Sequence, residues 1–79
     1  MPTEQLASLI AWHRQRAGLS QVELAQHAGV SRYVVQDLEA GHGRTTWGKL
    51  CAVLSVLNLS FEPVGPLVPA WRNATSAGK

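Results

Sequence analysis

The sequence predicts an all-α fold of four short helices, followed by one short β-strand. Three observations support this fold class. Helix-start and helix-stop signals divide residues 4–57 into four segments. Apolar residues recur at helical spacing within these segments, and the period changes to two after Leu57. We expect residues 1–64 to form the folded domain and residues 65–79 to be a flexible tail without regular structure.

The chain is small enough to limit how it can be stabilised. Its 79 residues and 8.5 kDa provide one domain with a marginal core. Cys51 is the single cysteine, which excludes an internal disulfide and a Cys/His zinc cluster. We therefore expect no metal and no cofactor. Oligomerisation, most simply a homodimer, is the stabilising supplement that remains.

Charge and sequence composition also limit the function. The formal net charge is +2 and the pI is about 9.2, which permits nucleic-acid binding without requiring it. The first residues carry no basic segment and no long apolar run, so we expect neither a signal peptide nor a membrane span, and the cytoplasm is the expected compartment. No catalytic residue set has a workable spacing, so we expect a protein that is not an enzyme.

The first predicted helix spans residues 4–17. Thr3 is expected to cap its start, and Gly18 follows its end. One face has helical spacing and carries Leu6, Leu9, Ile10, His13 and Ala17. Trp12 projects away from that face.

The second predicted helix spans residues 21–27. Ser20 and Glu23 have the spacing of a capping box, in which each side chain bonds the backbone N–H of the other residue. Gly29 is expected to end this helix in the left-handed conformation.

The third predicted helix spans residues 32–40, with Ser31 as its cap and Gly41 at its end. Two short helices joined by a turn of about four residues around a glycine form the helix-turn-helix pattern. Such motifs place the start of the second helix in the DNA major groove.

The exposed face of that third helix carries Arg32, Tyr33 and Gln36. Arg can donate two hydrogen bonds to guanine, and Gln can pair similarly with adenine. Tyr33 can stack on a base, meet a thymine methyl or bond a phosphate. We therefore predict base contacts by these three residues. The alternative is three polar side chains on a solvated helix.

The fourth predicted helix spans residues 47–57, and Thr45 or Thr46 is expected to cap it. It is apolar nearly all round, so we expect one face to pack on a second copy. After it, Leu57, Leu59 and Phe61 alternate with polar residues. A lone strand at 59–64 needs a partner, most simply the same strand of a second copy, running antiparallel. The predicted dimer contacts are Val53, Leu57, Leu59 and Phe61.

Several motifs resemble the Cro/C1-type (XRE) helix-turn-helix family, whose fold is that of the lambda repressor. They are LSQ at 19–21, ELA at 23–25, GVS at 29–31 and DLEAG at 37–41. Within this family the chain most resembles the HipB-type antitoxins of HipBA toxin–antitoxin modules. QLA at 5–7, RQRAG at 14–18, TT at 45–46 and LNLSF at 57–61 carry the narrower resemblance, which covers residues 3–62.

The resemblance implies a dimeric transcriptional repressor. It implies C-terminal strands that form a ribbon between subunits, and a kinase-like HipA toxin that the antitoxin dimer neutralises while it sits on the operator of its own operon. The operator would be double-stranded DNA with two half-sites about 34 Å apart. Two alternatives stay open: a stand-alone regulator without a toxin, and a protein-interaction subunit that no longer binds DNA.

The resemblance also assigns roles to further residues. Arg14 and Glu39 correspond to an internal ion pair. Gln21 corresponds to a residue that bonds the DNA backbone, although helix-start polarity alone would also explain it. The full predicted set of phosphate contacts is Gln21, Ser31, Arg44, Thr45 and Thr46.

Two tryptophans lie outside the predicted core. Trp71 stands in the tail and Trp12 stands off the core face of its helix. Each is a candidate anchor for a partner protein, since tryptophan is enriched in binding hot spots. The alternative for Trp71 is that it folds back onto Trp12 or the strand.

Overall fold

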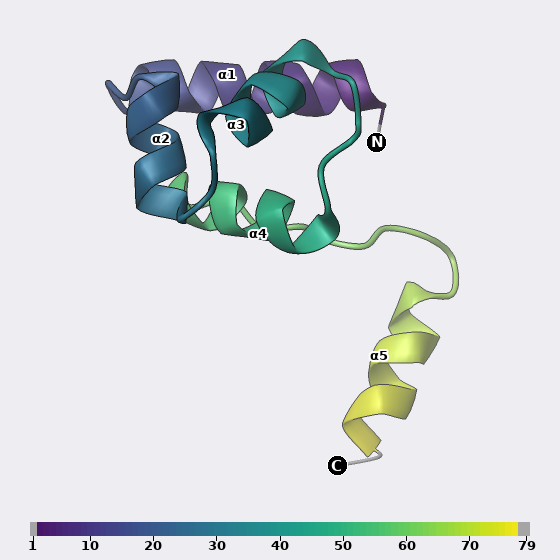
Figure 1. Ribbon diagram of the computed structural model, residues 1–79. Helices are drawn as coiled ribbons and strands as arrows, with labels where there is room; N and C mark the ends of the chain where they lie inside the picture. The colour runs from purple at the N-terminus through teal and green to yellow at the C-terminus, as the bar shows by residue number, and fades with distance from the viewer. Residues whose placement is uncertain (1, 78–79) are drawn as a thin grey trace.

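The computed structural model describes residues 2–77 and is all-helical over that range (Figure 1). Its helices are α1 (Thr3–Arg16), α2 (Gln21–Ala28), α3 (Arg32–Ala40), α4 (Trp47–Val56) and α5 (Val68–Ala77). None of these helices combines the length and the apolar character needed to cross a membrane. The all-α class and the first four helices agree with the prediction to within one or two residues.

The start of α1 differs from the prediction. Thr3 is the first helical residue, and Pro2 is the N-cap, with extended backbone angles of φ −63° and ψ 148°. The Pro2 carbonyl accepts a hydrogen bond from the Leu6 N–H at 3.1 Å. Thr3 therefore does not cap the helix, because its own backbone is already helical.

The signals around α2 act as predicted. The Ser20 hydroxyl accepts from the Glu23 N–H at 3.0 Å, and Glu23 Oε1 accepts from the Ser20 N–H at 2.9 Å. Gly29 ends the helix with φ +70°, which glycine adopts without a side-chain clash. Ser31 is the N-cap of α3, but its hydroxyl makes no capping hydrogen bond, so that part of the prediction was wrong.

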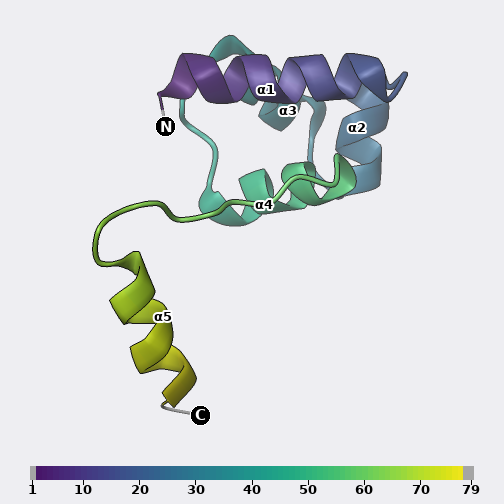
Figure 2. The same ribbon diagram turned by 180° about the vertical axis from the view of Figure 1, so that it is seen from behind.

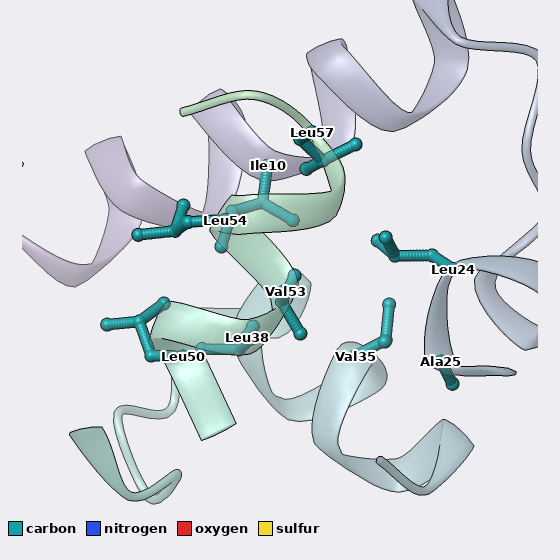
Figure 3. Close-up of a cluster of buried hydrophobic side chains, with 9 residues drawn as sticks. All are labelled: Ile10, Leu24, Ala25, Val35, Leu38, Leu50, Val53, Leu54 and Leu57. Carbon is teal, nitrogen blue, oxygen red and sulfur yellow. The ribbon is translucent and has the colours of Figure 1, made fainter. Parts of the chain in front are cut away.

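A single core is formed by all four N-terminal helices. In Figures 1 and 2, α1 and α4 form opposite sides of the domain and α2 and α3 lie between them. One apolar stripe from each helix enters the space they enclose (Figure 3). The core residues are Ile10, Leu24, Ala25, Val35, Leu38, Leu50, Val53, Leu54 and Leu57. This packing fixes the orientation of α2 relative to α3.

The core also corrects two of the predicted dimer contacts. Val53 is 0% exposed and Leu57 is 8% exposed within one chain, so neither presents a surface to a second copy. The prediction was wrong because α1, α2 and α3 already cover that side of α4. Leu59 packs against the core, while Phe61 stacks on the exposed Trp47 with ring centroids 5.0 Å apart.

The predicted strand does not form within residues 2–77. Asn58 has φ +58°, and the Leu59 N–H donates back to the Leu54 carbonyl at 2.9 Å. These contacts close the end of α4, after which residues 59–64 continue without regular structure. A strand requires a hydrogen-bonding neighbour, and residues 2–77 of one copy supply none there.

The tail was expected to lack regular structure, and this expectation is wrong for residues 68–77, which form α5. Pro69 stands in the first turn, where its missing N–H leaves no hydrogen bond unmade. Ala70 follows it, and the Thr75 hydroxyl donates to the Trp71 carbonyl at 2.8 Å. Residues 78 and 79 of the predicted tail lie outside the described residues. The helix extends away from the four-helix domain (Figures 1 and 2).

Candidate nucleic-acid interface

The structure brings the three predicted base-contact residues to one exposed face of α3. Val35 and Leu38 of α3 enter the core on the opposite side. Arg32, Tyr33 and Gln36 are all exposed, and Tyr33 has 68% of its surface accessible. The Arg32 guanidinium lies 5.2 Å from the centroid of the Tyr33 ring. Buried neighbours thus hold the helix while hydrogen-bonding and aromatic groups face outward.

A groove runs beside this face, between α3 and the start of α4. Tyr33 and Val34 line one wall, and Arg44, Thr46 and Lys49 line the other. Lys49 was not among the predicted contacts. Its position four residues before the apolar Val53 gave no sign that it lies beside the third helix. Two cations and the start of α4 beside α3 form a site that suits a phosphate.

The two threonines of this groove have different roles. The Thr46 hydroxyl caps α4 by accepting from the Lys49 N–H at 3.4 Å, and its own proton stays available to a phosphate. The Thr45 hydroxyl instead donates to Asp37 Oδ2 at 2.9 Å. Thr46 is therefore the better phosphate donor of the pair.

The ion pair between Arg14 and Glu39 is present and joins α1 to the end of α3. Arg14 Nε lies 2.6 Å from Glu39 Oε2, and Arg14 Nη2 lies 3.0 Å from Glu39 Oε1. Arg14 Nη1 also donates to the Leu19 carbonyl at 2.9 Å. The hydrogen bond to Glu39 raises the pKa of Arg14 against the opposing effect of burial, so the Arg14 guanidinium stays charged.

Gln21, predicted as a phosphate contact, also belongs to this network. Its amide Nε2 donates to Glu39 Oε1 at 3.1 Å. One side-chain N–H group of Gln21 is therefore used in a hydrogen bond within the protein. The rest of the amide is available to contact DNA. Sequence patterns did not reveal this contact, because it joins residues 18 positions apart.

The two candidate protein anchors lie on separate surfaces. Trp12 is exposed on α1, where its ring lies 4.9 Å from the His13 ring and 5.2 Å from the Arg16 guanidinium carbon. Trp71 is exposed on α5 and lines an apolar hollow with Pro63, Pro66 and Leu67. Trp71 therefore borders a hollow that it shares with the segment just before it.

Comparison with known proteins defines the class. The chain belongs to the helix-turn-helix domain family, which it matches over residues 5–66. This class of domain binds DNA through the second helix of its motif, here α3.

Two solved structures are similar to this chain in both sequence and fold. A chain in the structure of a HipA-HipB-O2-O3 complex is 27% identical, with a TM-score of 0.74 over 84% of this chain and 93% of that chain. A structure described as MDT Protein matches with the same values. The comparison with curated proteins gives no match. These likenesses confirm the resemblance to XRE-type proteins of the HipB kind.

Proposed function

We propose that the protein is a sequence-specific transcriptional repressor and the antitoxin of a HipBA-like toxin–antitoxin module, acting in the cytoplasm. The face of α3 carries this proposal. Arg32, Tyr33 and Gln36 stand exposed on a helix whose other side is locked in the core. Arg44, Thr46 and Lys49 lie alongside, where the DNA backbone would pass.

Base reading and backbone binding would divide between these groups. Arg32 and Gln36 would form paired hydrogen bonds with base edges. Arg44, Thr46 and Lys49 would contact phosphates, which set position and affinity but not sequence. Gln21, Ser31 and Thr45 complete the proposed backbone contacts, with Thr45 restricted by its bond to Asp37.

The protein would act as a homodimer on a two-fold operator. Trp47 and Phe61 form an exposed aromatic pair, and Leu59 stands half-buried beside them. A second copy could cover this surface and pair with residues 59–64, which have the alternating pattern of a strand. Repression would follow from the dimer occluding the promoter of its own operon.

The proposed toxin partner is a kinase-like protein of the HipA type. The likeness to a chain in a HipA-HipB-O2-O3 complex supports it, and the exposed Trp12 and Trp71 offer anchors. A stand-alone regulator without a toxin is the second candidate, favoured by the fact that the family match defines only the DNA-binding domain.

A reporter experiment tests repression. The DNA upstream of the gene would drive a reporter, with the protein supplied in trans as the wild type, as Arg32→Ala/Gln36→Ala, or as the control Gln5→Ala/Arg72→Ala. The control removes the same side-chain types from α1 and α5. We expect the wild type and the control to lower reporter output and the α3 variant to lose this effect. Equal output from all three would reject the repressor.

Co-purification with a kinase-like protein encoded beside the gene tests the antitoxin role. We expect a stable complex that Trp12→Ala or Trp71→Ala weakens. Repression without a complex would favour the stand-alone regulator. A complex without DNA binding would favour a protein-interaction subunit that no longer binds DNA.

A further inference from the structure

Asp37 connects α3 to the α3–α4 loop at three points. Its main-chain carbonyl accepts from the His42 N–H at 3.3 Å. Its carboxylate Oδ2 accepts from the Arg44 N–H at 3.1 Å and from the Thr45 hydroxyl at 2.9 Å. Asp37 of α3 thus bonds His42, Arg44 and Thr45 of the loop.

Among the described residues, the Thr46 cap is the one other side-chain hydrogen bond in this loop. Gly41 and Gly43 both have left-handed backbones, with φ of +77° and +70°, and residues 42–46 contain no helix or strand. A segment of this kind populates many conformations unless side chains restrain it, and binding must then offset the lost entropy. Arg44 itself is exposed, so its position depends on its backbone.

The charge of Asp37 is unexpected at this place. Asp37 lines the same groove as Arg44, Thr46 and Lys49, and a carboxylate there repels a phosphate. A residue chosen only to attract DNA would not be acidic. The two hydrogen bonds that its carboxylate accepts from the loop compensate for this repulsion.

We propose that Asp37 is a positioning residue for the DNA backbone contact. Its carboxylate fixes the loop so that Arg44 and the first turn of α4 face a phosphate while α3 reads the bases. This inference rests on the proposed DNA-binding function and adds a residue that couples the two kinds of contact.

The free protein provides the first test. Asp37→Asn keeps a side-chain oxygen acceptor without the charge, and Asp37→Ala removes both. We expect amide hydrogen exchange at Arg44 to be roughly tenfold faster in Asp37→Ala and nearly unchanged in Asp37→Asn. Only Asp37→Ala loses the side-chain oxygen that accepts from the loop. Glu4→Ala, which removes an exposed carboxylate from α1, is the control.

DNA titration at two salt concentrations provides the second test. We expect Asp37→Asn to bind upstream DNA as tightly as the wild type or more tightly. We expect Asp37→Ala to bind roughly tenfold more weakly, as for one lost charge-assisted hydrogen bond. Its slope of log affinity against log salt should shrink by about 0.9, the value for one phosphate. The preference for upstream over unrelated DNA should not change.

Each other outcome overturns a defined part of the proposal. Equal Arg44 exchange in all variants would show that Asp37 does not restrain the loop. Asp37→Ala binding as tightly as Asp37→Asn would show that the carboxylate only repels DNA. If the wild type shows no preference for upstream DNA, the repressor proposal fails and the DNA role of Asp37 fails with it, whatever the exchange result.

Discussion

At the scale of single residues, Arg14 and Glu39 show how one contact orients the DNA-binding motif. Glu39 stands one residue before the end of α3 and accepts from Arg14 of α1 and Gln21 of α2. The Arg14 and Glu39 side chains are only 14% and 8% exposed. Three helices therefore meet at one carboxylate near the end of α3.

Removing this carboxylate should destabilise the fold. We expect Glu39→Ala to lower the free energy of unfolding by about 3 kcal/mol, because it leaves a largely buried guanidinium unpaired. Gln21→Ala removes a single hydrogen bond to the same carboxylate and should cost about 1 kcal/mol. Denaturant unfolding measures both. A Glu39→Ala variant as stable as the wild type would contradict the structural role.

The capping box should make stability depend on pH. The Ser20 backbone N–H, by donating to Glu23, lowers the pKa of that carboxyl. A depressed folded-state pKa adds stability above the ordinary carboxyl value of 4.5, and this is lost as the pH falls through the folded pKa. We expect the stability difference between wild type and Glu23→Gln to shrink on acidification to below that value. An unchanged difference would contradict this.

Residue patterns predicted some contacts and not others for a physical reason. The Ser20–Glu23 box could be predicted because it joins residues three positions apart in one helix. The bonds from Thr45 to Asp37 and from Gln21 to Glu39 could not, because tertiary packing creates them. Arg14 and Glu39 became predictable only through the family resemblance.

At the scale of elements, the helices that begin and end at local signals were predicted well. Caps and left-handed glycines act within a few residues, so α2 and α3 follow from their own sequence. The strand at 59–64 depends on a partner outside the chain. The helix α5 was missed because its Pro69 and small residues were taken as signs of irregular structure, although proline is compatible with a first turn.

Two glycines test this account of the helices. Gly48 lies in α4, and an added methyl would meet no atom within 4 Å. We expect Gly48→Ala to raise the free energy of unfolding by about 0.5–1 kcal/mol.

Gly29 is the matched control, since an added methyl there also meets open space. Its φ of +70° should nevertheless make Gly29→Ala destabilising by about 1 kcal/mol. Thermal unfolding distinguishes the two variants, and equal effects would contradict the reading of the α2 end as a conformational stop.

At the scale of the whole molecule, the core explains what the dimer surface can and cannot be. Nine buried apolar residues pack against one another within a single chain. Val53 and Leu57 are therefore buried without a second copy. On the outer side of α4, Trp47 and the nearby Phe61 remain exposed. The dimer proposal therefore moves from the inner side of α4 to its outer side.

Sedimentation tests this surface. We expect the wild type to be a dimer and Trp47→Ala/Phe61→Ala to be a folded monomer, because truncating two aromatic anchors removes the centre of the interface. Trp12→Ala removes another exposed tryptophan, from α1, and should stay dimeric. A monomeric wild type would reject the homodimer, and a dimeric double variant would place the interface elsewhere.

The proposed repressor function depends on the exposed face of α3 reading DNA sequence. The most direct test is a titration of the purified protein against upstream and unrelated DNA at two salt concentrations, together with Arg32→Ala/Gln36→Ala. We predict binding that weakens steeply with salt for both DNAs, with a preference for upstream DNA that the variant loses. Weak binding without preference, equal in the wild type and the variant, would contradict the claim.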